Sequence, residues 1–381
     1  MIRTFCKNLL SIISILVLPL WIMGISTPLE AQTPIQFQQI LTPDQSAAAG
    51  LHEIWQLPLV VDPNQNRIIA ITPLDDAVYV LTSEGFLINI DKNAGTTRWR
   101  IQLPSAGVIT SRPVDFATNE ILIVSQGQVL ILDSRTGKVV PGQSQTLSFA
   151  PGTNPLVGDG HIFIGGLNDS MYALSNDFPL YNIWFQLATG DSFTSDPVLV
   201  EDMLIFGSRS GMLWGKPAED GQGGWGRQLG GAIIASPAAT DENVYYPCMD
   251  GKVYAVEAAS GIVSWATRLP GDLNLRPAAV DDNQVLVPTG GEGLFCLDAE
   301  SGIITWGPVE HVDKVLAVIG STVYAGTTDN DIKIINLKSG TVTATAALNG
   351  TMVFAPETSG NVFYVASEDG RVAALTPNNI P

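Results

Sequence analysis

A pattern of about forty residues recurs eight times along the chain and constrains the fold more than any other feature. Each copy has two short runs of alternating apolar residues, separated by a tight turn. The turn positions recur every 38 to 43 residues, at Gly85, Gly127, Ser170, Gly211, Gly251, Gly293, Asp331 and Gly370. Such runs predict β-hairpins, and a period of this length is typical of propeller blades.

Each hairpin is flanked by two further predicted strands. A short first strand opens with proline in most copies, as in "NPLV" at Asn154 and "DPVLV" at Asp196. Proline has no N–H to donate, so it is tolerated at the start of a strand or on a sheet edge, and the innermost strand of a blade is such an edge. A fourth strand is expected to end in a tryptophan. The pattern predicts an all-β, eight-bladed β-propeller of four-stranded blades over residues 51–381.

The two ends of the chain complete this prediction. The eighth copy stops without a fourth strand, whereas "LHEIWQLPL" near the N-terminus reads as an isolated fourth strand that carries Trp55. We expect this strand to close the last blade, so that the ring has no incomplete blade. Residues 32–50 show no sustained periodicity and are predicted to be a flexible leader.

An acidic residue, a glycine and a tryptophan recur at four-residue spacing, as in "DAESGIITW" from Asp298 to Trp306. The acid can bind turn amides, the glycine adopts a turn conformation that other residues resist, and the tryptophan fills a large volume. Recurrence of the motif at one repeat position favours a structural role in docking blades. The tryptophans assigned this role are Trp55, Trp99, Trp184, Trp225, Trp265 and Trp306.

The copy "DGKVYAVEAASGIVSW" (residues 250–265) resembles the quinoprotein-type (PQQ-like, tryptophan-docking) propeller repeat, and the resemblance covers about residues 51–376. The chain is similar to the BamB family of outer-membrane protein assembly factors. That similarity implies an exported, non-catalytic scaffold without a cofactor, a monomeric propeller that binds envelope proteins such as β-barrel assembly components. The alternative implied by the repeat is a quinoprotein dehydrogenase with pyrroloquinoline quinone and calcium, or a propeller that binds a small ligand. Quinoprotein dehydrogenases typically carry a disulfide between adjacent cysteines, and this sequence has no Cys-Cys pair.

Residues 1–31 are predicted to be a secretory signal peptide. Arg3 and Lys7 precede an apolar stretch, and Ala31 supplies a small residue for cleavage. An uncleaved membrane anchor is the alternative, because the apolar stretch approaches the ~20 residues that span a bilayer. Either interpretation places the body of the protein in the periplasm or cell envelope. Cys6 precedes the apolar stretch and no other cysteine lies near the cleavage region, so the cysteine of a lipoprotein signal is missing.

The formal net charge of -18 disfavours nucleic acid as a partner, because the chain would repel phosphate backbones. His52, His161 and His311 are widely separated, and no spacing suggests a metal site or a catalytic set. We therefore predict neither. Cys248 and Cys296 are expected to be buried free thiols.

The residues before the inner-strand prolines are predicted to meet near one mouth of the central channel. They are Arg112, Asn154, Asp196, Ser236 and Arg276. A ring of polar groups there is a candidate binding site for an acidic peptide or a small ligand. Solvated charges at the rim without a ligand are the alternative.

Overall fold

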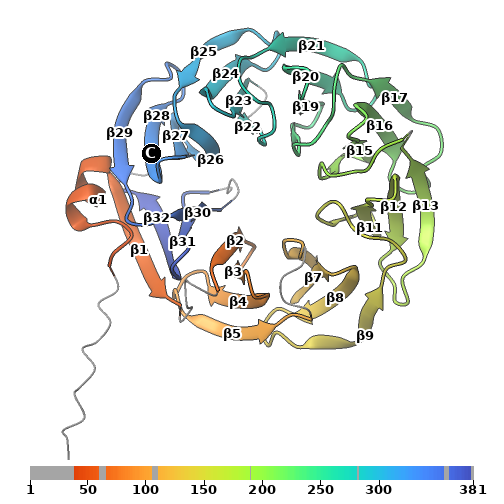
Figure 1. Cartoon of the computed structure of the whole chain (residues 1–381), viewed down its shortest axis with the longest axis horizontal. Helices are drawn as coiled ribbons and strands as arrows, with labels where there is room; N and C mark the ends of the chain where they lie inside the picture. The colour runs from red at the N-terminus through yellow and green to blue at the C-terminus, as the bar shows by residue number, and fades with distance from the viewer. Residues whose placement is uncertain are drawn as a thin grey trace, which may run out of the picture. The chain divides into compact units, whose positions relative to one another are not determined.

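The computed structural model describes residues 38–59, 66–104, 110–188, 190–280, 283–355 and 360–378. Across them the chain forms eight four-stranded antiparallel sheets, arranged in a ring as the blades of a β-propeller (Figure 1). The predicted all-β, eight-bladed fold is confirmed. The predicted signal peptide, including Arg3, Lys7 and Ala31, lies outside the described residues.

The blades are numbered in chain order, and the strands of each are given from the innermost outward. Blades 1 to 4 consist of β2 (Ile68–Pro73), β3 (Ala77–Thr82), β4 (Phe86–Asp91) and β5 (Thr97–Gln102); β6 (Val114–Ala117), β7 (Glu120–Ser125), β8 (Gln128–Asp133) and β9 (Val139–Thr146); β10 (Leu156–Gly158), β11 (His161–Gly165), β12 (Ser170–Ser175) and β13 (Asn182–Leu187); and β14 (Val198–Val200), β15 (Met203–Gly207), β16 (Met212–Pro217) and β17 (Trp225–Gln228).

Blades 5 to 8 follow the same order. They consist of β18 (Ala238–Ala239), β19 (Asn243–Cys248), β20 (Lys252–Glu257) and β21 (Val263–Arg268); β22 (Ala278–Val280), β23 (Gln284–Thr289), β24 (Gly293–Asp298) and β25 (Ile304–Val309); β26 (Val312–Ile319), β27 (Thr322–Thr327), β28 (Asp331–Asn336) and β29 (Val342–Ala347); and β30 (Met352–Phe354), β31 (Phe363–Ser367), β32 (Arg371–Pro377) and β1 (Leu51–Pro58).

The core lies between neighbouring blades rather than in one central cluster. The two middle strands of a blade have both faces covered by the adjacent blades, so they carry nearly continuous apolar runs. In blade 5, for example, Val244, Tyr245 and Tyr246 are all buried. Tyr246 also crosses to blade 4, where its hydroxyl donates to the carbonyl oxygen of Ile205 at 3.3 Å. Each blade is thus stabilised by its two neighbours.

The predicted closure by the N-terminal strand is also confirmed. Strand β1 pairs antiparallel with β32, from Leu51 opposite Pro377 to Pro58 opposite Arg371. A shift of register between Glu53 and Trp55 interrupts the ladder once. The first and last strands of the ring therefore share the sheet of blade 8 (Figure 1).

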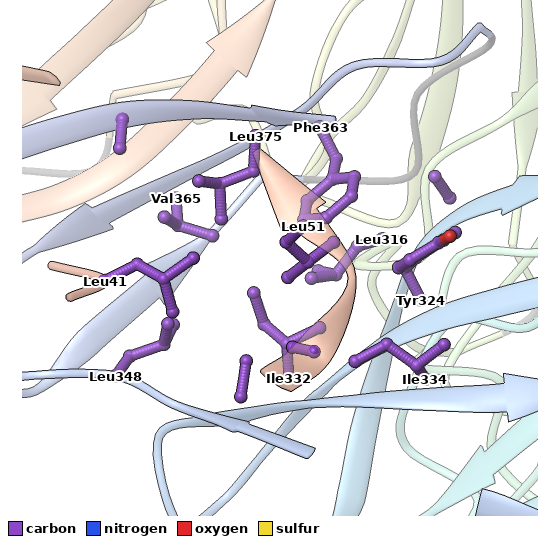
Figure 2. Packing of buried hydrophobic residues seen from close by; sticks show 14 of the residues in the cluster. Leu41, Leu51, Leu316, Tyr324, Ile332, Ile334, Leu348, Phe363, Val365 and Leu375 are labelled. Carbon is purple, nitrogen blue, oxygen red and sulfur yellow. The ribbon is translucent and has the colours of Figure 1, made fainter. Parts of the chain in front are cut away.

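Residues 38–50 differ from the flexible leader expected over residues 32–50. They include helix α1 (Pro43–Ala49), which begins with a capping box between Thr42 and Gln45 and ends at Gly50 in the left-handed conformation. Leu41 packs with Leu51, Leu348 and other side chains of blades 7 and 8 (Figure 2). Seven helical residues are too few to produce a periodic pattern, so this helix depends on its caps and on tertiary packing.

One local expectation about the outermost strands is wrong. The tryptophan does not end the fourth strand; Trp99, for example, is the third residue of β5 and points inward between flanking exposed residues. Within the described part of the chain, no helix has the length and apolar character needed to cross a bilayer.

Candidate functional site

Six tryptophans connect neighbouring blades by the same pair of contacts. Each lies on the outermost strand of one blade. Its Nε1 donates to a backbone carbonyl of the next blade, in the turn between the third and fourth strands, which we call the outer turn. The six are Trp55, Trp99, Trp184, Trp225, Trp265 and Trp306, with N···O distances from 2.7 to 2.9 Å. Each indole also covers the turn glycine that follows the accepting carbonyl; a Cβ added to Gly302 would lie 2.5 Å from Cδ2 of Trp265.

The glycine and the tryptophan of one sequence motif therefore act at two different blade interfaces. The acidic residue acts within its own turn: Oδ1 of Asp298 accepts hydrogen bonds from the backbone N–H of Ser301 at 2.8 Å and from its hydroxyl at 2.6 Å. These bonds hold the pKa of Asp298 below its ordinary value. The motif is thus a device that shapes one turn and joins three consecutive blades.

At two interfaces the described residues include no docking tryptophan, and other contacts join the blades. Between blades 2 and 3, the side-chain amide of Gln145 makes two hydrogen bonds with the backbone of Leu180, donating to its oxygen at 2.9 Å and accepting from its nitrogen at 2.7 Å. Between blades 7 and 8, Ala344 stands where the tryptophan is expected, and α1 packs against β29. Helix α1 thereby fills the place that a docking tryptophan occupies at the other interfaces.

The structure brings the five candidate residues of the channel rim to one cavity. Arg112, Asn154, Asp196, Ser236 and Arg276 each lie two residues before an innermost strand, and all five line a cavity of about 380 Å³. Its other lining residues come from the innermost strands of blades 1 to 4, from Leu74 just after β2, and from the prolines of the motif. The cavity therefore lies at the centre of the ring.

Three of these rim side chains also form a ladder of hydrogen bonds around the centre. The backbone N–H of Arg112 donates to Oδ1 of Asn154 at 2.8 Å, and the N–H of Asn154 donates to Oδ1 of Asp196 at 2.8 Å. The N–H of Asp196 then donates to the hydroxyl oxygen of Ser236 at 3.2 Å. Asn154, Asp196 and Ser236 therefore satisfy backbone groups of the preceding blade, which is a structural use that the sequence did not suggest.

Lys314, which the sequence analysis did not single out, lies close to the two rim arginines. Lys314 of β26 lines a cavity of about 90 Å³ together with Arg112, Arg276 and Asp313. Burial lowers the pKa of Arg112, with a further contribution from Arg276, while Asp196 opposes the shift. Burial and the charge of Arg112 likewise lower the pKa of Lys314, against the opposing effect of Asp313. No proline marks β26, so the repeat alignment gave no signal for Lys314.

A second surface feature lies on the outermost strand of blade 3. Ile183, Phe185 and Leu187 alternate along β13 and are 39%, 54% and 56% exposed, while Trp184 between them is buried. Among the described outermost strands, only β13 has three exposed large apolar side chains in alternation. On β5, Arg98, Arg100 and Gln102 occupy the corresponding positions around Trp99. We call Ile183, Phe185 and Leu187 the β13 stripe.

An apolar cavity is linked to the β13 stripe through aromatic side chains. It has a volume of about 410 Å³ and is lined by Leu147, Phe149 and Leu167, among others. Phe149 stacks on Tyr172 with ring centroids 3.9 Å apart, and Tyr172 lies 6.3 Å from Phe185. These aromatic contacts connect the cavity to the stripe.

The remaining candidate residues lie apart from these sites. Cys248 and Cys296 are buried free thiols, as expected. Across the described ranges, no group of three or more histidine, cysteine, aspartate or glutamate side chains is arranged to hold a metal ion. His311 lies 3.0 Å from Asp329 at the surface, and Nδ1 of His161 contacts the backbone oxygen of Asp159.

The ring of four-stranded blades joined by indole contacts defines a tryptophan-docking β-propeller. Residues 48–215, 181–309 and 217–343 match the family model described as "Outer membrane protein assembly factor BamB". The chain belongs to this family.

A curated relative, the outer membrane protein assembly factor BamB of Marinobacter adhaerens (strain DSM 23420 / HP15), is 24% identical over 127 residues. That match covers 33% of this chain and 31% of the relative, so the chain spans about a third of the relative's length.

Solved structures share the fold. The crystal structure of BamB from Moraxella catarrhalis matches with a TM-score of 0.69 and 18% identity, covering 86% of this chain and 97% of that one. Quinohemoprotein alcohol dehydrogenase from Comamonas testosteroni matches with a TM-score of 0.64 and 13% identity, covering 90% and 79%. At these identities the likeness concerns the fold alone.

Proposed function

We propose that this BamB-family propeller is an exported, non-catalytic scaffold that binds an extended segment of an envelope protein along β13. The names of its relatives support a role in outer-membrane protein assembly, where β-barrel assembly components are the natural partners. The signal-like residues 1–31 support export to the periplasm or cell envelope. The observation that carries the proposal is the β13 stripe.

The geometry of β13 suits the addition of a strand. Within its sheet β13 pairs with β12 on one side, and it is the outermost strand of blade 3. Outer-edge backbone groups can pair with an extended peptide, while alternate side chains provide specificity. Ile183, Phe185 and Leu187 offer that peptide an apolar contact surface, and the cavity beyond Tyr172 offers room for a larger side chain.

Site-specific photo-crosslinking in intact cells tests this proposal. A photoreactive residue at Phe185 is expected to capture a defined envelope protein, and Leu187→Asp in the same chain should abolish that product. Ile262 is the matched control, because it is 54% exposed but lies in a turn of blade 5. Capture of the same protein from position 262, or no product from position 185, would contradict a partner site on β13.

The non-catalytic part of the proposal has a separate test. The mature protein is given pyrroloquinoline quinone, calcium and an artificial electron acceptor, together with alcohol or sugar substrates. We expect neither cofactor binding nor substrate oxidation. Cofactor-dependent oxidation of a substrate would contradict a non-catalytic scaffold and would favour a quinoprotein dehydrogenase.

A further inference from the structure

Three cationic side chains from separate blades share one small space at the centre of the ring. Arg112 precedes β6 of blade 2, Arg276 precedes β22 of blade 6, and Lys314 lies on β26 of blade 7. They line the cavity of about 90 Å³ together, and both arginines extend into the cavity of about 380 Å³. We call these three residues the cation trio.

The cation trio makes no salt bridge within the part of the chain that the structure describes. None of its members forms an ion pair with a carboxylate of the described residues. Nζ of Lys314 donates to a neutral group, the backbone oxygen of Phe354, at 3.2 Å. Bringing like charges together in a partly buried space is unfavourable unless an anion compensates them. The clustering also contrasts with a chain whose formal net charge is -18.

Two carboxyl groups lie nearby, and neither neutralises the trio fully. Asp196 is committed to the rim ladder: Asn154 donates its backbone N–H to Oδ1 at 2.8 Å and its side-chain amide to Oδ2 at 3.0 Å. Oδ1 of Asp313 is buried and has no hydrogen-bond partner among the described residues. Burial raises the pKa of Asp313, although Lys314 opposes the shift, so the charge of this carboxyl group is disfavoured.

We propose that the central cavity binds a small hydroxycarboxylic acid, with its carboxylate on the cation trio and its hydroxyl near Asp313. This site is separate from the β13 stripe, and the inference does not depend on the proposed partner. It assigns a ligand to two of the rim residues and adds Lys314 and Asp313, which the sequence did not reveal.

The donors present match this ligand class. A guanidinium group offers a planar fork that binds a carboxylate through two hydrogen bonds, and a lysine adds a mobile charge. The hydroxyl of Ser236 accepts from the N–H of Asp196 and still has its own proton to donate into the cavity. The orphaned Oδ1 of Asp313 requires a donor, which the hydroxyl of a hydroxy acid supplies. Arg276 is exposed and leaves the site open to solvent.

Calorimetric titration of the mature protein with malate, succinate and inorganic sulfate, at constant ionic strength, tests the site. Malate and succinate carry the same two carboxylates and differ by one hydroxyl. We expect saturable binding of malate, weaker binding of succinate, and little binding of sulfate. Equal affinity for malate and succinate would overturn the role of Asp313, and equal affinity for all three would reduce the site to a general counter-ion effect.

Variants locate the binding. Arg276→Gln and Lys314→Gln should each weaken malate binding by about tenfold or more, which corresponds to the loss of one charge-assisted contact. Lys138→Gln is the matched control, since Lys138 is an exposed cation on the outer turn of blade 2. Without malate, the two site variants should melt at or above the parent temperature, because they relieve repulsion. The proposal is wrong if malate does not bind, or if all three variants bind it equally.

Discussion

Trp265 of blade 5 lies directly over Gly302 of blade 6, and the indole Nε1 donates to the carbonyl oxygen of Ala299 at 2.8 Å. The glycine has a φ of +69°, so its missing side chain serves two purposes. It permits the left-handed turn and leaves room for the ring of the neighbouring blade.

Gly302→Ala should lower the free energy of unfolding by about 2–4 kcal/mol, from the positive φ and from overpacking against Trp265. Gly160→Ala is the matched control, because Gly160 has a φ of +72° but no atom within 4 Å of the added Cβ. The free energy of unfolding of this control should fall by only ~1 kcal/mol. Urea unfolding measures both, and equal losses would show that the indole contact adds nothing.

Trp55→Ala tests the closure of the ring. Trp55 covers Gly95 and donates to the backbone oxygen of Lys92 at 2.9 Å, so its removal should cost about 3–5 kcal/mol. Trp99→Ala, between two blades whose strands are contiguous in sequence, should cost a similar amount. Thermal melting compares the two variants. A much milder effect at Trp55 would mean that β1 contributes little to closure.

Gln145→Ala tests the interface without a tryptophan. The substitution leaves the backbone N–H and C=O of Leu180 without their partners and should cost about 1–3 kcal/mol. Hydrogen exchange should increase over residues 176–184 before it increases elsewhere. Gln186→Ala removes a hydrogen bond to the oxygen of Leu187 at an exposed site and serves as the control. Uniform exchange in both variants would argue against a local role for Gln145.

The turn carboxylates predict a loss of stability in acid. The pKa of Asp298 is lowered below the ordinary 3.8 by the hydrogen bonds from Ser301. Its stabilising contribution is therefore complete above about pH 4 and is lost as the pH falls through the folded-state pKa. Asn336 of blade 7 accepts the equivalent bonds from Ser339 at 3.0 and 3.1 Å, so Asp298→Asn should keep the turn.

Urea midpoints measured from neutral pH down to about pH 3 test the role of Asp298. The difference between the parent and Asp298→Asn should be largest at neutral pH and should shrink in acid. A constant difference across this range would show that the Asp298 carboxylate does not titrate as expected.

Thiol titration reports both the fold and the processing of the N-terminus. Burial raises the pKa of the Cys248 thiol to about 11 and also raises that of Cys296. Neither should react with a disulfide reagent in the native protein at mildly alkaline pH. The sequence contains three cysteines, including Cys6, so the unfolded protein should show two thiols if residues 1–31 are removed and three if they are retained. Rapid reaction of the native protein would contradict the burial.

The fold could be predicted closely from the sequence because each blade repeats the same pattern of apolar runs and turn residues. The turn positions set the hairpins, and the isolated strand with Trp55 indicated how the ring closes. Helix α1 was not predicted. Its stability comes from capping by Thr42 and from packing against blades 7 and 8, and neither produces a periodic pattern in the sequence.

The sites were less predictable, since they depend on where the copies differ. The prolines that begin the innermost strands indicated that Arg112 and Arg276 lie at the centre. Strand β26 has no such proline, so the sequence did not indicate that Lys314 lies there as well. A comparison of outermost strands position by position would have found Phe185, because the residue after the docking tryptophan is polar or small in the other blades, for example Arg100 in blade 1 and Ala266 in blade 5. The ladder through Asn154 and Asp196 joins residues of different blades and needs the three-dimensional arrangement to be seen.

The pairing of β1 with β32 sets the order of events during biosynthesis. Strand β1 is the first strand of the ring to be synthesised, and β32, its partner, is the last. Blade 8 therefore stays incomplete until the whole chain has emerged, however early the intervening blades form, because this contact has the longest loop to close. A chain that ends before β32 leaves β1 without its partner, and the unpaired edge of such a strand favours association with other chains. The ring can therefore close only after β32 has been synthesised.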